Sequence, residues 1–219
     1  MAQQILIIGL GQFGMSLAAT LTSKGAEVIA ADIRKNMVEE AASFVTEALV
    51  LDATDEAELA RLEPGKRDAT VCAIGDDSKE ASIICTALLR QMGSPCVVAR
   101  ANNPMHQRIL QLVGAHQIVN PEQEFGKRFA NRLIYRQLVA DMPLGDGLHL
   151  SEITVKDKMI GKTLIELALP KKYGIMVVAV RRGMPSSVFQ PTPDEPLQEN
   201  DNLVLVSKEE AIKKLMEGK

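Results

Sequence analysis

Over the first 120 residues, short apolar runs alternate with longer segments of mixed polarity. The runs have the length of buried strands, and the segments between them have the length and period of helices. The runs that predict strands are residues 5–8, 28–31, 48–51, 69–74, 96–100 and 117–119. The segments that predict helices are residues 13–24, 35–42, 55–62, 77–92 and 104–113. Strands that alternate with helices over short loops predict an α/β fold, with a doubly wound parallel sheet covered by helices on both faces.

The pattern changes after this point. A helix is expected over residues 122–140, because Pro121 supplies the backbone angle of a first helical turn. The proline and the glycines of residues 142–147 predict a domain boundary. Beyond it, strands are expected at residues 150–155, 176–181 and 202–206, and helices at residues 161–169 and 208–216. The sequence therefore predicts a first domain over residues 1–140 and a second, smaller α+β domain over residues 148–219.

The first predicted strand runs directly into a glycine-rich turn at residues 9–14, which has the spacing G-x-G-x-x-G. In dinucleotide-binding sites Gly9 would allow the tight turn, Gly11 would let the backbone approach a phosphate, and Gly14 would let the helix pack on the strand. The helix N-terminus that follows attracts an anion. Asp32 ends the second predicted strand, close to the ~20-residue offset at which a carboxylate binds ribose hydroxyls. We therefore favour a nucleotide-binding Rossmann sheet over a nucleotide-free α/β protein.

Ligands of doubly wound sheets bind beyond the carboxyl ends of the strands. In this chain the residues at those ends are the glycine turn, several carboxylates and one guanidinium, that of Arg100. Arg100 is placed to neutralise a phosphate or a neighbouring carboxylate, and Gly75 lets the backbone approach a ligand. The residues following the strands thus form one rim that suits a nucleotide.

Some polar residues at this rim have a simpler structural interpretation. Asp55 and Asp77 are expected to cap the helices that follow them, whereas Asp76 fits a cap and a ligand contact equally well. Arg34 could contact a 2′-phosphate, but the carboxylate of Asp32 would repel that group. We therefore expect NAD or an adenosine nucleotide rather than NADP.

Composition and missing motifs narrow the function. The net charge of −3 gives no attraction to nucleic acid or to anionic lipid. The N-terminal apolar run is too short for a membrane span and lacks the features of a signal peptide. The three cysteines have no C-x-x-C spacing and are expected to be reduced and buried in a cytosolic protein. With no nucleophile elbow, Walker lysine or zinc motif in the chain, we expect a binding protein and not an enzyme.

These features resemble the family of potassium-conductance regulators, the RCK or KTN domains of the bacterial Trk and Ktr uptake systems. The similarity covers essentially the whole chain. The segments that carry it are residues 7–14, 51–55, 71–77, 98–102, 114–115 and 119–122 in the first domain, and residues 172–183 and 199–203 in the tail. Several ordered motifs make this resemblance more specific than the glycine turn alone.

The resemblance implies a cytosolic gating subunit, peripheral to the inner face of the cell membrane. Such proteins pair through the helix at residues 122–140, and the dimers form an octameric ring beneath a membrane potassium channel subunit. ATP and ADP, or NAD and NADH, would bind the rim and change the shape of the ring. Glu122 matches a family glutamate that coordinates a divalent or monovalent cation at the dimer interface. By position, the nucleotide would be held by Gly9, Gly11, Gln12, Phe13, Gly14, Asp32, Ile33, Asp52, Ala53, Thr54, Ala73, Ile74, Gly75 and Arg100.

The chain departs from the family at Gln12. Many Ktr-type members carry arginine there, and that arginine reaches the nucleotide phosphates. Glutamine only forms hydrogen bonds, which puts strong discrimination between tri- and diphosphates in doubt. Some relatives also bind cyclic di-AMP at the dimer interface of the small lobe, and Ile175, Arg181 and Arg182 lie in the corresponding region.

Two functions from other classes compete with this one. A small NAD-dependent oxidoreductase would need a catalytic acid or base, and none is evident in the sequence. A nucleotide-responsive transcription factor would need a helix-turn-helix or a basic face. Neither feature is found, so we expect no nucleic-acid partner.

Overall fold

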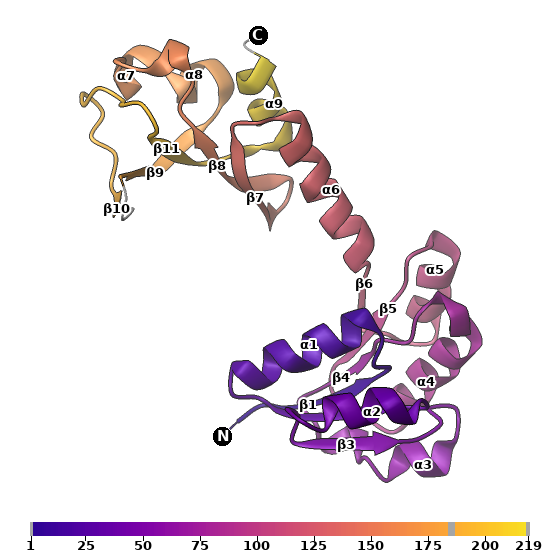
Figure 1. The fold of residues 1–219 in the computed structure, drawn as a ribbon. Helices are drawn as coiled ribbons and strands as arrows, with labels where there is room; N and C mark the ends of the chain where they lie inside the picture. Colours follow the sequence, from indigo (N-terminus) through magenta and orange to yellow (C-terminus); the bar gives the residue numbers. More distant parts are fainter. Residues whose placement is uncertain (1, 184–186, 218–219) are drawn as a thin grey trace. The chain divides into compact units, whose positions relative to one another are not determined.

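The computed structural model describes residues 2–183 and 187–217 and separates into two compact units, Met1–Glu124 and Phe125–Lys219 (Figure 1). The first unit contains a six-stranded parallel sheet with the strand order β3-β2-β1-β4-β5-β6. Its strands are β1 (Gln4–Ile8), β2 (Glu27–Asp32), β3 (Glu47–Val50), β4 (Ala69–Cys72), β5 (Val97–Arg100) and β6 (Gln117–Val119). Its helices are α1 (Gln12–Ser23), α2 (Lys35–Ala41), α3 (Glu56–Ala60), α4 (Lys79–Gln91) and α5 (Pro104–Leu112). The predicted doubly wound fold is confirmed.

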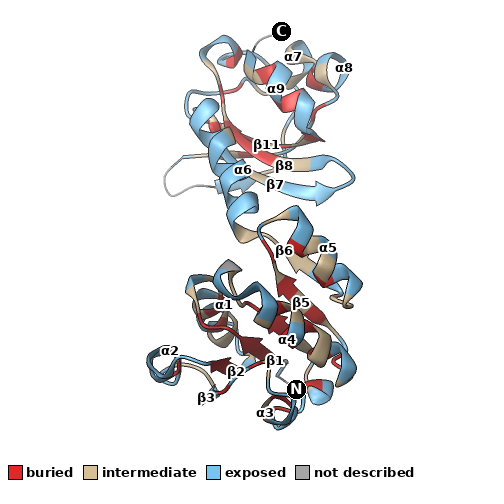
Figure 2. Ribbon diagram, turned by 90° about the vertical axis from the view of Figure 1, so that its right-hand side faces the viewer, coloured by how far each residue is buried: buried red, intermediate tan, exposed pale blue. Residues whose placement is uncertain are grey.

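Both faces of this sheet are buried, as expected for a parallel sheet. Along β1 the side chains alternate between two cores: Leu6 and Ile8 face one, and Ile5 and Ile7 face the other. The first core includes side chains from α3, α4 and α5, and the second includes side chains from α1 and α2. Figure 2 shows the central strands of this sheet as buried. A sheet held from both sides fixes the positions of the loops that follow its strands.

The helix expected over residues 122–140 is shorter than predicted. Helix α6 (Pro121–Ile134) ends six residues earlier, and its last turn is closed by the bond from Tyr135 N–H to Asn131 C=O. The segment expected to be a domain boundary, residues 142–147, belongs to the second sheet instead. There β7 (Leu138–Gly145) pairs with β8 (Leu148–Thr154) across a two-residue turn of Asp146 and Gly147.

This hairpin has a physical reason that the sequence interpretation missed. Asp146 and Gly147 both have positive φ, at 50° and 74°, which is the geometry of the type I′ turns that join antiparallel strands. Asp-Gly is the dipeptide that such turns favour. Pro143 lies in β7, an edge strand, where a missing N–H is tolerated.

The second unit is built on a five-stranded antiparallel sheet with the order β10-β9-β11-β8-β7. Its remaining strands are β9 (Met176–Arg182), β10 (Ser187–Phe189) and β11 (Asn202–Lys208). The predicted helix at residues 161–169 is divided into α7 (Leu164–Leu167) and α8 (Leu169–Tyr173), and α9 (Glu209–Glu217) closes the chain. The α+β character of this part is confirmed, while β7 and β10 were not predicted. Its core includes Ile153, Ile175, Leu203 and Leu205.

None of the helices in the described part of the chain combines enough length with enough apolar character to cross a bilayer.

Candidate functional site

A cavity of about 490 Å³ opens at the carboxyl ends of the strands in the first unit, a size within the usual range of ligand sites. It lies between β1 and β4, where the strand order of the sheet reverses, which is the position at which doubly wound sheets bind ligands. We call this cavity the groove. Its lining residues are Ile8, Gly9, Gly11, Gln12, Asp32, Ile33, Arg34, Leu51, Asp52, Ala53, Ala73, Ile74, Gly75, Asp77, Ser78, Ala81 and Arg100.

The structure brings most of the predicted nucleotide residues together at the groove, but three of them do not line it. Phe13 packs against the core beneath α1, Gly14 packs under the turn, and Thr54 donates to Asp52. Arg34, Ser78 and Ala81 line the groove although they were not in the predicted set. Ser78 and Ala81 begin the helix after β4, so the rule used for the other strand ends would have found them.

The three glycines of the turn have different roles. Gly9 has φ +95°, and a Cβ there would lie 2.8 Å from the backbone nitrogen of Ile74. A Cβ on Gly14 would lie 1.9 Å from the carbonyl oxygen of Gly9. Gly11 has nothing within 4 Å of the position of a Cβ, and it begins α1 with no side-chain cap. The open space at Gly11 and the free N–H groups of the first turn of α1 suit an anion.

Asp32, the last residue of β2, is buried, and both of its carboxylate oxygens accept hydrogen bonds. Its Oδ2 accepts from Leu10 N–H at 2.6 Å and from Arg34 Nη2 at 3.1 Å. Its Oδ1 accepts from Arg34 N–H at 2.8 Å and from Arg34 Nε at 3.0 Å. Burial acts to raise the pKa of Asp32, but the bonds from Arg34 and Leu10 and the charge of Arg34 outweigh it, so the pKa lies below its usual value.

The acidic residues after β3 and β4 divide between structural roles and the groove. Asp55 accepts from Ala57 N–H and Glu58 N–H and caps α3, as predicted. Asp77 lines the groove, while the N-cap residue of α4 is Ser78 and its side chain makes no capping bond, so the predicted capping role of Asp77 is wrong. Asp52 accepts from Thr54 N–H and Thr54 Oγ1, which lower its pKa. The side chain of Asp76 lies outside the described structure.

Arg100, the last residue of β5, connects the groove with the first turn of α6. Its Nη2 donates to Oε1 of Glu122, while its buried Nε has no hydrogen-bond partner in the described structure. A buried donor without an acceptor is costly, so an acceptor oxygen of a ligand in the groove would stabilise this Nε. Gly75 is close by, and a Cβ there would lie 3.5 Å from Arg100 Nη1.

Glu122, the predicted cation ligand, is half exposed and pairs with Arg100. Among the described residues no group of three or more His, Cys, Asp or Glu side chains is arranged to hold a metal. A cation at Glu122 would therefore need further oxygen ligands from a nucleotide or from a second copy of the chain.

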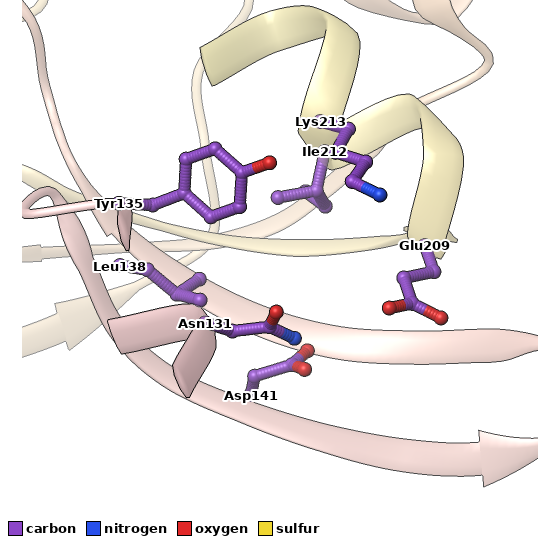
Figure 3. A pocket seen from close by; sticks show the side chains of 7 residues that line it. All are labelled: Asn131, Tyr135, Leu138, Asp141, Glu209, Ile212 and Lys213. Carbon is purple, nitrogen blue, oxygen red and sulfur yellow. The ribbon is translucent and has the colours of Figure 1, made fainter. Parts of the chain in front are cut away.

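Two cavities of the second unit differ from the groove in size or in lining. The first has a volume of about 20 Å³, and Figure 3 shows its lining side chains between the end of α6, β7 and α9. They are Asn131, Tyr135, Leu138, Asp141, Glu209, Ile212 and Lys213. That space holds about one water molecule and excludes a nucleotide.

The second cavity measures about 540 Å³ and is lined mainly by apolar residues of α7, α8 and β9, with Lys171 as its charged residue. None of the three residues considered for cyclic di-AMP lines it. Ile175 is buried in the core, Arg181 lies 3.3 Å from Glu152, and Arg182 binds Asp201 and Glu195.

Comparisons with known proteins agree over most of the chain. Residues 5–121 match the family model of the TrkA-N domain, and residues 148–217 match that of the TrkA-C domain. The Ktr system potassium uptake protein A of Vibrio alginolyticus is 35% identical over 96% of this chain and 94% of its own length. The Ktr system potassium uptake protein C of Bacillus subtilis (strain 168) is 33% identical over 94% of this chain and 92% of its own length.

The fold also matches a solved structure, the GsuK channel bound to NAD. The match has a TM-score of 0.66 and 19% sequence identity, and it covers 99% of this chain and 40% of that chain. At this identity it supports the fold alone.

Proposed function

The chain belongs to the TrkA family of potassium uptake proteins, and we propose that it is the nucleotide-sensing regulatory subunit of a Trk- or Ktr-type potassium transporter. In this role it acts at the cytoplasmic face of the membrane, on a potassium channel subunit. The observation that carries the proposal is the position of Arg100. One end of its guanidinium faces a groove of nucleotide size, and the other end is bonded to α6.

The groove offers suitable contacts for the phosphates and the ribose of an adenosine nucleotide. The open backbone at Gly11, the uncapped N-terminus of α1 and the unpaired Nε of Arg100 suit phosphate oxygens. Asp32 lines the groove and is the carboxylate that would accept from the ribose hydroxyls. ATP and ADP, or NAD and NADH, share the adenosine diphosphate part that these contacts would hold. Gln12 lines the groove and offers hydrogen bonds without charge.

We propose that the site binds and does not catalyse. The polar side chains that line the groove are carboxylates, Ser78, Gln12 and two arginines, with no histidine or cysteine among the described lining residues. Hydride transfer would also require a substrate site beside the cofactor. The comparisons offer no support for an oxidoreductase, since the named relatives are potassium uptake proteins.

Helix α6 provides a surface for pairing with a second copy. Phe125, Phe129 and Leu133 are exposed and recur at intervals of four residues, which places them along one side of the helix. The rings of Phe125 and Phe129 stack at 5.6 Å. Figure 2 shows α6 as exposed along its length. An apolar stripe of this kind indicates a protein interface, and we propose that it forms the dimer from which an octameric ring assembles.

Nucleotide binding would control the transporter through the shape of that assembly. A ligand shifts a conformational equilibrium only by the difference between its affinities for the two states. Arg100 would supply that difference, because a phosphate that binds its guanidinium competes with Glu122 of α6. A cation at Glu122 would then be favoured when a nucleotide holds Arg100, with phosphate oxygens among its ligands.

Cyclic di-AMP binding by the second unit stays a prediction. The apolar cavity beside α7 and α8 has the volume for a dinucleotide, but Lys171 is the charged side chain that lines it. Dimerisation of this unit would have to bring further donors to the phosphates.

The test combines titration calorimetry with light scattering. The chain is titrated with ATP, ADP, NAD, NADH and cyclic di-AMP, and its mass in solution is measured with and without each ligand. We expect binding of at least one adenine nucleotide, an oligomeric mass, and no loss of NADH absorbance on incubation. A monomer that binds none of the first four ligands would contradict the proposal, and steady consumption of NADH would favour the oxidoreductase.

A further inference from the structure

The carboxylate expected to bind ribose is already satisfied by the protein itself. A carboxylate offers about four positions for hydrogen-bond donors. Asp32 receives four donors, namely Leu10 N–H, Arg34 N–H, Arg34 Nε and Arg34 Nη2, at 2.6 to 3.1 Å. Its side chain is 5% exposed. A ribose hydroxyl therefore cannot reach Asp32 unless one of these donors leaves.

The four donors differ in their freedom to move. Leu10 N–H belongs to the turn between β1 and α1, and Leu10 itself is fully buried. The N–H of Arg34 is held by the backbone at the start of α2. Among the described residues, Asp32 alone bonds the guanidinium of Arg34, whose side chain is 54% exposed and lines the groove. It can rotate into water, where its charge is solvated again.

From this geometry we propose that the side chain of Arg34 is a displaceable cap on the ribose subsite and sets the contribution of the ribose hydroxyls to affinity. The inference rests on the proposed nucleotide function. When the groove is empty, the guanidinium satisfies the buried carboxylate. When a nucleotide binds, its 2′- and 3′-hydroxyls replace the guanidinium as donors to Asp32.

The exchange is near balance, because two neutral donors replace one charged bidentate donor at the same acceptor. Binding through the ribose therefore gains little net affinity in the natural protein. The phosphate contacts at α1 and Arg100 remain the main source of affinity. In a variant without the guanidinium, the ribose hydroxyls still donate to Asp32 but no longer have to displace another donor.

The inference is tested with ADP, the part that ATP and NAD have in common, and with 2′,3′-dideoxy-ADP, which lacks both donors. Dissociation constants are measured by calorimetry for the natural chain, Arg34→Met and the control Lys35→Met. The control removes the same charge one residue away, and Lys35 pairs with Glu39 instead of Asp32. Arg34→Lys keeps the charge but loses the bidentate geometry, and thermal unfolding verifies that each variant folds.

For the natural chain and Lys35→Met we expect the dideoxy compound to bind at most about threefold more weakly than ADP. We expect ADP to bind Arg34→Met roughly tenfold more tightly than it binds Lys35→Met. The dissociation constant of the dideoxy compound divided by that of ADP should rise by a similar factor in Arg34→Met. Arg34→Lys falls between them.

Equal ligand ratios in Arg34→Met and Lys35→Met would overturn the inference, as would weaker ADP binding to Arg34→Met than to its control. A large ratio in the natural chain would overturn it without any variant. These results leave the nucleotide function standing. If none of the proteins binds ADP, the inference fails; if none of them binds ATP, NAD or NADH either, the nucleotide function fails with it.

Discussion

The carbonyl oxygen of Gly9 lies 1.9 Å from the position that a Cβ atom on Gly14 would occupy. A separation this short is far inside van der Waals contact, and the atom that would have to move is the backbone of the turn. The third glycine of the G-x-G-x-x-G turn is thus required for α1 to pack on β1, which agrees with the interpretation of the sequence.

Gly14→Ala is therefore expected to destabilise the first unit by about 3 kcal/mol or more, because a methyl group there forces the turn and α1 apart. Urea unfolding followed by far-UV circular dichroism measures the loss. Gly126→Ala is the matched control, since it adds a methyl group in α6 with nothing within 4 Å. Equal unfolding midpoints for the two variants would contradict the packing role of Gly14.

Gly11→Ala is expected to leave folding intact and to weaken nucleotide binding. Nothing lies within 4 Å of the added methyl group, and the φ of −70° suits alanine. The methyl group would, however, occupy the space that a phosphate needs, at a cost of about 2 kcal/mol or more in binding. Calorimetry with ADP beside a thermal unfolding curve separates the two effects. Unchanged affinity would place the phosphate elsewhere.

The Arg100–Glu122 pair gives a prediction with opposite signs for its two members. Arg100→Met should weaken ADP binding by about 2 kcal/mol, because a charged donor to phosphate is lost. Glu122→Gln, measured with EDTA present so that no divalent cation bridges Glu122 and the phosphates, should leave binding unchanged or tighten it, because the guanidinium is released from its carboxylate partner. Arg108→Met, an exposed arginine of α5, controls for net charge. If both substitutions weaken ADP binding alike, the role of the pair is structural and Arg100 does not contact phosphate.

Much of the first unit could be predicted because one rule determines it. Apolar runs of strand length separated by helical segments define the sheet, and residues at the carboxyl ends of parallel strands meet at one edge. That rule predicts that Asp32, Gly75 and Arg100 lie at one edge of the sheet, and all three line the groove. The rule does not give the partners of a side chain. Whether Arg34 turns toward Asp32 or toward water depends on the backbone at the start of α2, which the sequence does not reveal.

The errors at β7 have a different cause. Pro143 and Gly145 are common in linkers, and the helical pattern of α6 continues weakly past its true end. The Asp146-Gly147 dipeptide was the contrary signal, because it favours a two-residue hairpin between strands. The weak helical pattern after Ile134 is overridden by tertiary packing, because Leu138 is buried in the second core and fixes the start of β7.

The stripe on α6 predicts how the oligomer responds to a charge. Phe129→Asp places a carboxylate among Phe125 and Leu133, where it would be buried without a partner on pairing. We expect the mass in solution to fall to that of the monomer at micromolar concentration. Gln123→Asp introduces the same charge on the same helix away from the stripe and should leave the mass unchanged. A Phe129→Asp protein of undiminished mass would show that α6 is not the pairing surface.

The pair of Arg182 and Asp201 makes the stability of the second unit sensitive to acid. Asp201 is fully buried, and Arg182 Nε and Nη2 donate to it at 2.7 and 2.8 Å. Burial acts to raise the pKa of Asp201, but the bonds from Arg182 and Gln198 N–H outweigh it and keep the pKa below its usual value. A carboxyl with a lowered native pKa stabilises the fold above its unfolded pKa of about 3.9, and this contribution is lost as the pH falls through the native value.

Asp201→Asn should therefore cost about 2–3 kcal/mol at pH 7, because Arg182 loses its charged partner, and much less at pH values below the native pKa of Asp201. Both tyrosines of the chain, Tyr135 and Tyr173, pack against the core of this unit, so tyrosine fluorescence during urea unfolding reports on it selectively. Asp194→Asn, the same change at an exposed position, provides the control. The difference in unfolding free energy between the two variants should shrink steadily below about pH 4. A difference that stays constant with pH would mean that the hydrogen-bond geometry of Asp201, and not its charge, stabilises the second unit.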